Sequence, residues 1–226
     1  MDLIQNCNLI VDCDEILVNI SPKWVRGIVE KRDIFEPYLD LTEVDKALLR
    51  GEIPFKNLVM NRPEYYLNKW LKRPDVDEMP EEIFEEFMKI HHTKGFYEDL
   101  NLTKMGVAIG QLTNHPSVIK TYVVSKIGRG AVETCLDSKT RLIQSIIPNH
   151  KLEIIYVPAE EKKSDYIVNI DVKNGFIFDD ENKNLFDYLE SGVSECNFYI
   201  PRLGYNRPPM RLLEMADENK VSVSYY

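Results

Sequence analysis

Cysteine is scarce in this chain, and the few cysteines stand apart from one another. Only four of the 226 residues are cysteines, and no two of them form a C-x-x-C pair. They are Cys7, Cys13, Cys135 and Cys196. Zinc sites and disulfide frameworks usually show cysteines at recognisable spacings, so we expect four small buried apolar side chains in a reducing compartment. This pattern argues against a disulfide-stapled class and favours a cytoplasmic protein.

Long apolar runs are missing as well. No window approaches the roughly 20 apolar residues that a membrane-spanning helix needs. The first 15 residues, MDLIQNCNLIVDCDE, have no basic region, and their apolar run is too short for an export signal. We therefore expect no association with a membrane.

Positive charge is in deficit. The chain has 28 Lys and Arg residues against 37 Asp and Glu residues, a formal net charge of -9, and it shows no basic stripe. A general nucleic-acid binder would carry such a stripe, so we expect no general nucleic-acid binding. A small anionic substrate is compatible with this composition, because one local cationic pocket or metal ion can outweigh the electrostatic field of the whole protein.

What the chain does have is a series of short apolar runs that predict strands. With 44% hydrophobic residues it can bury a sizeable core. The runs are 8–11, 118–125, 152–157, 175–179 and 197–200. Each is continuous rather than alternating, which is typical of strands covered on both faces of a parallel sheet. Helical patterns at 130–147 and 182–191 separate the later runs, so the sequence predicts a doubly wound, Rossmann-like α/β fold.

The interval between the first two predicted strands breaks this rhythm. Within residues 22–114 no run reads as a strand, whereas helical patterns cover 42–50, 63–72 and 80–94. We therefore predict a helical cap at 22–114, inserted into an α/β core made of 1–21 and 115–226. The adjacent His91 and His92 would lie on a solvated helix end, and the aromatic residues of this interval would serve helix packing or stack on a base.

Polar side chains follow four of the predicted strands, where the active site of an open α/β sheet lies. They are Asp12 and Asp14, then Ser125 with Lys126 and Arg129, then Lys162 and Lys163, and last Asp179 and Asp180. Taken alone, any one of these four groups of polar residues would be interpreted as solvated surface or as a helix cap. Their order along the chain is the informative feature.

Together these four groups of residues resemble the motifs of haloacid-dehalogenase-like (HAD) phosphatases. VDCDEIL resembles the first motif, TYVVS the second, EKKSD the third and FIFDDEN the fourth. The helical interval between the first two motifs resembles the cap found there in one large branch. The long cap, and the two asparagines after the last aspartate pair, resemble the 5'-deoxyribonucleotidase branch in particular.

The resemblance implies a role for each aspartate. Asp12 would attack phosphorus and form an aspartyl-phosphate, and Asp14 would act as general acid and then general base. Mg²⁺ would be held by the carboxylates of Asp12 and Asp179 and by the backbone carbonyl of Asp14. Asp180 would support this set from outside or through a water molecule. Crowded acids at the strand ends are then explained by the cation expected among them.

The resemblance also implies a phosphate cradle made of Ser125 and a lysine. Lys163 is preferred to Lys162, because Lys163-Ser164-Asp165 matches the K-x-D form of the third motif. Glu15 departs from the pattern, since Gly or another small residue commonly follows the second aspartate. Glu181 is an alternative metal contact, in place of one of the two aspartates of the fourth motif.

These implications lead to a magnesium-dependent phosphomonoesterase acting on a small organic phosphate, with a nucleoside 5'-monophosphate preferred over sugar phosphates. A polynucleotide end-processing phosphatase is an alternative, with Arg202, Arg207 and Arg211 of the C-terminal tail as a basic track. The other interpretation of that tail is a wrap over the sheet edge that ends in the strand VSVSYY. A non-catalytic binding or regulatory module that kept the fold is the third hypothesis. The sequence does not decide the oligomeric state, and a homo-oligomer is one of the states that we consider.

Overall fold

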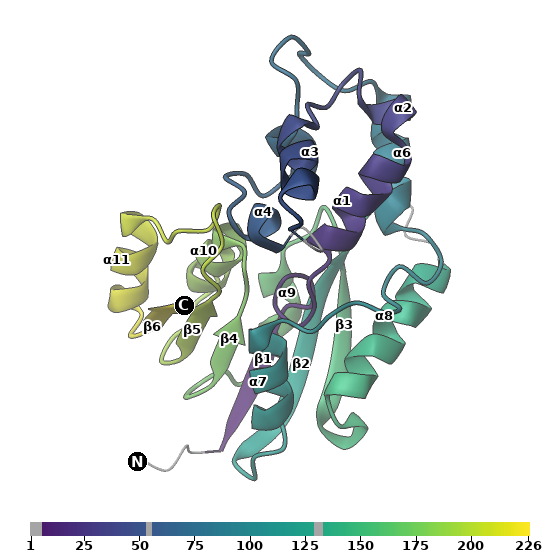
Figure 1. The fold of residues 1–226 in the computed structure, drawn as a ribbon. Helices are drawn as coiled ribbons and strands as arrows, with labels where there is room; N and C mark the ends of the chain where they lie inside the picture. The colour runs from purple at the N-terminus through teal and green to yellow at the C-terminus, as the bar shows by residue number, and fades with distance from the viewer. Residues whose placement is uncertain (1–5, 53–55, 129–132) are drawn as a thin grey trace.

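Parallel strands form one sheet in the computed structural model, which describes residues 6–52, 56–128 and 133–226 (Figure 1). Within these residues the strands are β1 (Cys7–Val11), β2 (Val118–Ile127), β3 (Leu152–Pro158), β4 (Phe176–Phe178), β5 (Asn197–Ile200) and β6 (Ser222–Tyr225). Their spatial order is β3-β2-β1-β4-β5-β6, and every neighbouring pair is parallel. The predicted doubly wound α/β class is confirmed, and the chain reverses its direction of winding at β1.

Side chains of β1 alternate between two apolar clusters, one on each face of the sheet. Leu9 and Val11 pack in a cluster that includes Ile143, whereas Ile10 packs in a second cluster that includes Leu185. All three β1 side chains are at most 1% exposed. Each contributes about 1.5–3 kcal/mol by leaving water. A strand buried on both faces needs a continuous apolar run, which explains the sequence pattern that predicted it.

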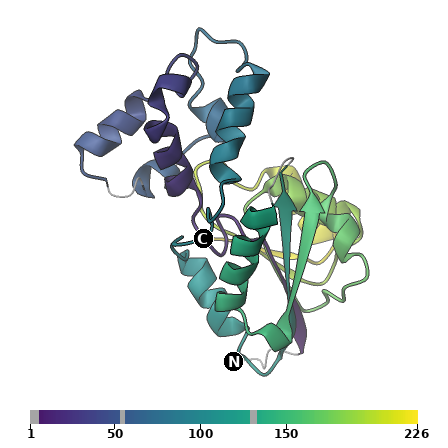
Figure 2. The same cartoon turned by 90° about the vertical axis from the view of Figure 1, so that its right-hand side faces the viewer.

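Helices cover both faces of this sheet (Figures 1 and 2). On one face lie α7 (Lys104–Leu112) and α8 (Glu133–Ile146), and on the other lie α9 (Lys163–Ile167), α10 (Asn182–Glu190) and α11 (Met210–Glu218). A 3₁₀ turn, η1 (Asn149–Lys151), precedes β3. The helices predicted at 130–147 and 182–191 correspond to α8 and α10, and residues 130–132 lie outside the described part of the chain.

A block of helices stands beyond the carboxyl ends of the strands, between β1 and β2 in the chain (Figure 1). Its helices are α1 (Ser21–Glu30), α2 (Arg32–Phe35), α3 (Thr42–Leu49), α4 (Lys56–Met60), α5 (Leu67–Trp70) and α6 (Glu81–His91). The predicted runs at 42–50 and 80–94 match α3 and α6. The limits 22–114 stay a prediction, and α7, which falls within them, contacts α8 of the core.

The helix predicted at 63–72 is correct only in its second half. Tyr66 is extended, and α5 begins at Leu67. Arg62 is buried and its guanidinium lies over the ring of Tyr205, while the Tyr65 ring contacts the same tyrosine edge-on. These contacts with the C-terminal segment hold the chain out of a helix, so tertiary packing overrides local propensity here.

The prediction that His91 and His92 lie on a solvated helix end is wrong. His92 is only 7% exposed, and the His91 ring stacks on Trp24 of α1 with ring centroids 4.8 Å apart. Phe96 contacts the edge of the same imidazole. The end of α6 is therefore packed, because aromatic rings from α1 and from the segment after α6 enclose it.

The C-terminal tail closes the sheet edge, as one of the two interpretations predicted. The VSVSYY run forms β6, which pairs with β5 in parallel. Arg202, Arg207 and Arg211 are all exposed. Among the described residues, no helix has both the length and the apolar character needed to cross a membrane.

The first turn of α7 is pinned to the loop that follows β1. Thr103 caps this helix by accepting a hydrogen bond from the Gly106 amide at 2.8 Å, and its own amide donates to the Leu17 carbonyl at 3.0 Å. A Cβ atom on Gly106 would lie 2.1 Å from that same carbonyl oxygen. Only glycine allows this approach, which fixes the loop carrying Asp12 and Asp14 against the core.

We expect Gly106→Ala to lower the free energy of unfolding by about 2–4 kcal/mol, because the added methyl group must displace the Leu17 backbone. Gly110→Ala in the same helix is the matched control. Its Cβ would meet atoms of Ile146 no closer than 3.3 Å, and alanine favours the helix by about 1 kcal/mol. Denaturant titration of both variants measures the difference. Equal stabilities would contradict the close approach.

Candidate active site

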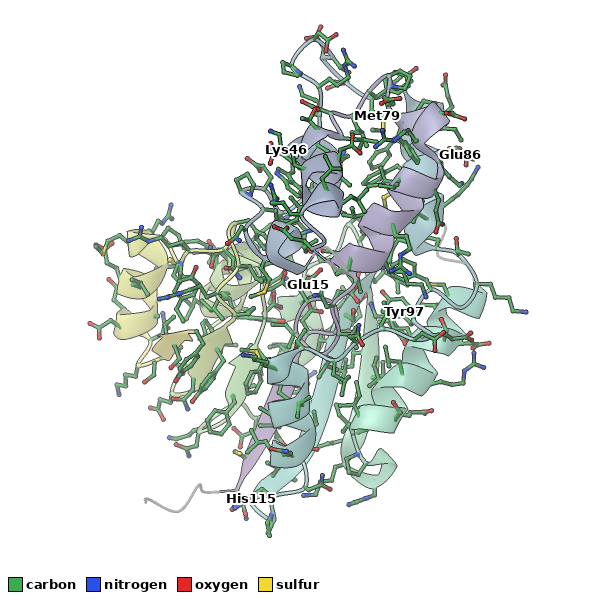
Figure 3. All side chains as sticks on the ribbon, in the orientation of Figure 1. Glu15, Lys46, Met79, Glu86, Tyr97 and His115 are labelled. Atoms are coloured by element: carbon green, nitrogen blue, oxygen red, sulfur yellow. The ribbon has the colours of Figure 1, made fainter. Side chains whose placement is uncertain are left out.

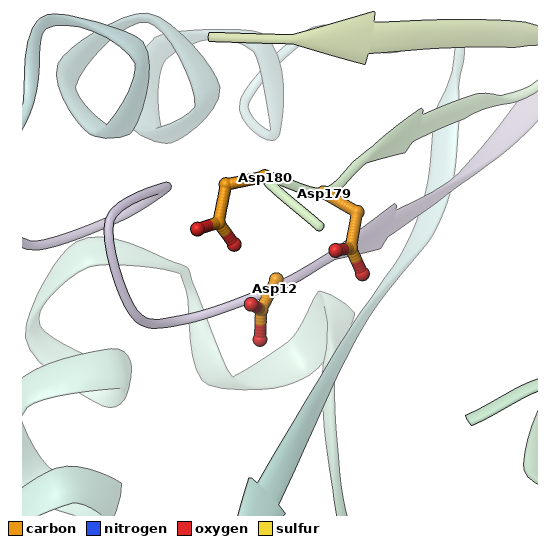
Figure 4. Close-up of side chains that lie close together, drawn as sticks. All are labelled: Asp12, Asp179 and Asp180. Atoms are coloured by element: carbon orange, nitrogen blue, oxygen red, sulfur yellow. The ribbon is translucent and has the colours of Figure 1, made fainter. Parts of the chain in front are cut away.

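Three carboxylates converge at the carboxyl ends of the two central strands β1 and β4. Asp12 follows β1, and Asp179 and Asp180 follow β4, whose Phe178 is the register partner of Val11. One oxygen from each carboxylate lies within 4.8 Å of the others (Figure 4). All three residues are at most 8% exposed. Asp12 and the Asp179–Asp180 pair, which we expected from the sequence to converge, are therefore neighbours. They lie at the point where the sheet reverses its winding.

Lys163 is the cation of this cluster. Its Nζ lies 2.9 Å from Asp12 Oδ1 and 2.9 Å from Asp179 Oδ2, and the residue is 2% exposed. Burial alone would lower the pKa of this ammonium, but Asp12 and Asp179 outweigh burial and raise the pKa well above its usual value. Lys162 is half exposed and pairs with Asp187 at 2.7 Å. Of the two lysines that the sequence offered, Lys163 lies at the cluster.

The positions of Asp179 and Asp180 are set by hydrogen bonds from α10 and from the C-terminal segment. Asn184 Nδ2 donates to Asp179 Oδ1 at 3.0 Å. Asn206 Nδ2 donates to the Asp180 carbonyl at 3.0 Å, and the Tyr205 hydroxyl donates to the Asp180 carboxylate. Sequence reasoning missed the last two contacts, because Tyr205 and Asn206 lie in an irregular Pro-containing stretch with no motif of its own.

The donor set of this cluster fits a hard divalent cation. Three buried carboxylates face a single ammonium, and carboxylate oxygens are the ligands that Mg²⁺ and Ca²⁺ prefer. Burial raises the pKa of Asp12 to about 6, and burial together with Asp12 raises the pKa of Asp180 well above its usual value. A further positive charge among them would relieve both effects. Glu181 is half-buried and is not one of these three converging carboxylates.

Ser125, near the carboxyl end of β2, has a buried hydroxyl group without a partner. The residue is 1% exposed, and its Oγ makes no hydrogen bond among the described residues. A buried polar group is nearly always hydrogen-bonded, so this hydroxyl, on the strand that pairs with β1, is available to donate to a ligand. Lys126 donates to the Ala159 carbonyl at 3.3 Å. Arg129 lies outside the described residues.

Asp14 is not one of the three converging carboxylates and has its own partners. Lys139 Nζ of α8 donates to one carboxylate oxygen at 2.9 Å, and the Tyr97 hydroxyl lies 3.0 and 3.2 Å from the two oxygens. Burial alone would raise the pKa of Asp14, but Lys139, with smaller effects of His91 and Tyr97, outweighs burial and lowers it. The predicted contribution of the Asp14 carbonyl to a metal site stays a prediction.

Sequence reasoning missed Lys139, although a signal for it was present. Lys139 is 2% exposed and stands four residues from both Cys135 and Ile143, which are buried on α8. A charged residue in the middle of an apolar helical stripe is costly unless it has a partner. That position in the 130–147 pattern indicated a buried acid facing it. Tyr97 carried no comparable signal.

Glu15, the residue that departs from the family pattern, joins the helical block to the core. Its φ angle is +60°, in the left-handed region that favours glycine. The buried carboxylate accepts hydrogen bonds from the Ser21 amide at 3.0 Å and from the Ser21 hydroxyl, to which Arg62 Nη1 donates at 2.9 Å. Glu15 and Tyr97 both lie where this block meets the sheet (Figure 3). A buried ionic network therefore offsets the backbone strain.

A separate hollow of about 1540 Å³ opens beside this junction. Its walls include α1, α7 and the aromatic side chains Phe176, Phe178 and Tyr199 of β4 and β5. Glu15 reaches it, but Asp12, Asp179 and Lys163 do not line it. The acid cluster therefore does not belong to this larger space.

Comparison with solved structures finds similar chains described as haloacid dehalogenase-like hydrolases. The HAD-hydrolase YfnB of Bacillus subtilis, in a magnesium-bound structure, is 12% identical over 92% of this chain and 97% of its own, with a TM-score of 0.49. A hydrolase of Xanthomonas campestris is 12% identical over 92% and 86%, with a TM-score of 0.47. One of Burkholderia xenovorans is 13% identical over 98% and 95%, with a TM-score of 0.45.

At these identities and TM-scores the likeness assigns no activity to this chain. No family model and no curated protein matches the sequence. Any functional assignment therefore depends on the side chains gathered at the strand ends.

We expect magnesium to stabilise the folded protein through the acid cluster. At a hundred times the dissociation constant, binding to the folded state alone adds about 2.7 kcal/mol, or about 5–10 °C in Tm. Asp179→Asn should abolish most of this shift, whereas Asp217→Asn, which alters an exposed carboxylate on α11, should keep it. Thermal unfolding with and without the ion measures the effect. A shift that survives in Asp179→Asn would place the ion elsewhere.

His91 should make stability depend on pH between about 4 and 6.5. Burial lowers the pKa of His91 from 6.5 to about 4 in the folded protein. Between these values the unfolded chain binds more protons, so stability falls as the pH drops, by up to about 3 kcal/mol at pH 4. His91→Gln removes this contribution, so its unfolding free energy should fall less from pH 7 to pH 4. Parallel pH profiles for the two proteins would contradict the assignment.

Proposed function

We propose that this protein is a magnesium-dependent phosphomonoesterase of the HAD type that works through an aspartyl-phosphate. The single observation that carries this proposal is the convergence of Asp12, Asp179 and Asp180 around Lys163 at the strand ends. The unpartnered hydroxyl of Ser125 supports it, because a phosphoryl oxygen is an acceptor that such a donor lacks. A nucleophile, a cation site and two phosphate donors are the parts that phosphoryl transfer to a carboxylate needs.

The first half of the reaction transfers the phosphoryl group to Asp12. An oxygen of the Asp12 carboxylate attacks phosphorus, and the bond from phosphorus to the ester oxygen breaks. The carboxyl group of Asp14 gives its proton to the departing oxygen, which leaves as an alcohol. When bound by Asp12, Asp179 and the Asp14 carbonyl, with Asp180 beside them, magnesium supplies the positive charge that lets two anions approach.

The second half returns Asp12 to its starting state. The oxygen of a water molecule attacks phosphorus, its proton passes to the Asp14 carboxylate, and the bond between phosphorus and Asp12 breaks to release inorganic phosphate. Lys139 stabilises the ionised form of Asp14 that takes up this proton. In the first half Asp14 must instead enter as the protonated acid, so its two roles differ by one proton.

Lys163 and Ser125 hold the phosphoryl oxygens during both halves. Lys163 supplies a full positive charge that already faces Asp12, and Ser125 supplies a hydroxyl donor from the end of the adjacent strand β2. Both side chains are buried, where electrostatic and hydrogen-bonding interactions are stronger than in water.

The substrate class that we propose is a nucleoside 5'-monophosphate or a similar small organic phosphate, as in the 5'-deoxyribonucleotidase branch. The rings of Tyr65 and Tyr205 lie edge-to-face with centroids 5.4 Å apart, and the Tyr205 hydroxyl reaches Asp180. Aromatic side chains therefore lie close to Asp180, and Arg62 covers the face of the Tyr205 ring, so a flat base would meet the exposed parts of these side chains. Trp24 stacks on His91 and is part of the packing.

The four buried free cysteines fit the reducing cytoplasm expected from the sequence.

The purified protein should release phosphate from a panel of nucleoside 5'-monophosphates and sugar phosphates when magnesium is present, and a chelator should stop it. Asp12→Asn removes the nucleophile and should lower turnover by at least about a thousandfold. Asp217→Asn on α11 is the matched control and should turn over like the unaltered enzyme. Colorimetric phosphate release measures all three proteins.

Two results would contradict the proposal. Robust turnover by Asp12→Asn would show that Asp12 is not the nucleophile. Absence of phosphate release from every substrate, in a protein that magnesium still stabilises, would favour a binding module instead.

A further inference from the structure

The Asp14 carboxylate is held from two sides that belong to different parts of the molecule. Lys139 comes from α8, which packs on the sheet, whereas Tyr97 comes from the segment that joins α6 to α7. The Tyr97 side chain is 1% exposed, and its hydroxyl lies within 3.2 Å of both carboxylate oxygens. Two donors of fixed position leave the carboxylate a single orientation.

The hydrogen bonds around Tyr97 form a directed chain. The Tyr97 hydroxyl donates its one proton to Asp14, because an ionised carboxylate can only accept a hydrogen bond. The Tyr97 oxygen is then the acceptor for His91 Nε2, which lies 2.8 Å away. The chain therefore runs from His91 to Tyr97 to Asp14, with a neutral imidazole carrying its proton on Nε2.

The far end of this chain is anchored in the helical block. His91 is the last residue of α6, and its ring stacks on Trp24 of α1 at an interplanar angle of 18°. The next residue, His92, packs against the loop after β2, since a Cβ on Gly128 would lie 2.6 Å from its Nε2. The end of α6 thus contacts both the Asp14 chain and the loop that follows Ser125. If the end of α6 moved away from these contacts, Tyr97 would lose its bond to His91 and Asp14 would lose this support.

We propose that Tyr97 and His91 are positioning residues that fix Asp14 for proton transfer, so that acid–base chemistry depends on the end of α6 keeping its contacts with Tyr97 and with the loop after β2. This inference rests on the proposed function and adds to it a link between the helical block and the general acid–base. Tyr97 acts on Asp14 directly, and His91 acts through Tyr97.

p-Nitrophenyl phosphate separates this role from a merely structural one. Its leaving group departs as p-nitrophenolate without a proton, so transfer of the phosphoryl group to Asp12 needs little help from Asp14. Hydrolysis of the aspartyl-phosphate still requires Asp14 to take a proton from water. Damage to the positioning chain should therefore slow the second half of the reaction and spare the first.

Rapid mixing of Tyr97→Phe with this substrate should give a fast release of about one p-nitrophenol per enzyme, followed by turnover about tenfold slower than that of the unaltered enzyme. The fast phase counts folded, competent sites, so partial unfolding cannot imitate the result. Tyr225→Phe is the control, because it also removes a tyrosine hydroxyl bond, of 3.4 Å to the Leu203 carbonyl, but at the sheet edge.

Two variants of His91 test the far end of the chain. His91→Phe keeps a flat ring against Trp24 but loses the donor to Tyr97, and should behave like Tyr97→Phe. His91→Gln loses the ring but keeps an amide donor, and should recover most of the lost steady-state rate. Rescue by the donor rather than by the ring supports the proposal.

Other outcomes would overturn it. Steady-state turnover of Tyr97→Phe equal to that of the unaltered enzyme would show that Asp14 needs no such support. Loss of the fast and slow phases by the same factor would assign Tyr97 a structural role only. Absence of any p-nitrophenol or phosphate release from the unaltered enzyme with magnesium would overturn the proposed function itself, and this inference with it.

Discussion

Mutual repulsion among buried carboxylates is the constraint on which the rest of this structure depends. Asp12, Asp179 and Asp180 are brought within a few ångströms of one another by two adjacent parallel strands, in surroundings that exclude water. Such an arrangement is unfavourable without positive charge, and Lys163 supplies one such charge within the cluster. The remaining excess of negative charge makes the site suited to a divalent cation. Strand order, the α9 lysine and the hydrogen bonds from Asn184 and Asn206 all serve to keep these charges in place.

A second group of buried charges connects the helical block to the sheet. Asp14 is bound by Lys139 and Tyr97, and Glu15 is bound through Ser21 to Arg62. Both acids belong to the short loop after β1, which α7 holds through the close approach of Gly106. The loop that carries Asp12 is thus also a loop that contacts the helical block.

Glu15 illustrates how a local departure from a family pattern can be a tertiary feature. A left-handed residue with a side chain costs about 1 kcal/mol relative to glycine, and a buried carboxylate costs more unless it is paired. Here the same side chain accepts two hydrogen bonds from Ser21, which in turn accepts one from the buried Arg62. The strain and the network therefore belong together, and neither is intelligible from residues 12–18 alone.

The sequence by itself determined the sheet and the polar residues that follow its strands, because continuous apolar runs and the acids that end them are local properties of the chain. It determined that Asp12 and Asp179 follow strands, and it ranked Lys163 above Lys162. Only the tertiary structure decided which side chains meet. Lys139, Tyr97 and His91 come from three segments whose distance from Asp14 depends on how α6 and α8 pack, and Tyr205 and Asn206 come from the irregular stretch between β5 and α11. Partners of a buried charge are chosen by the fold as a whole, and spacing along the chain does not encode that choice.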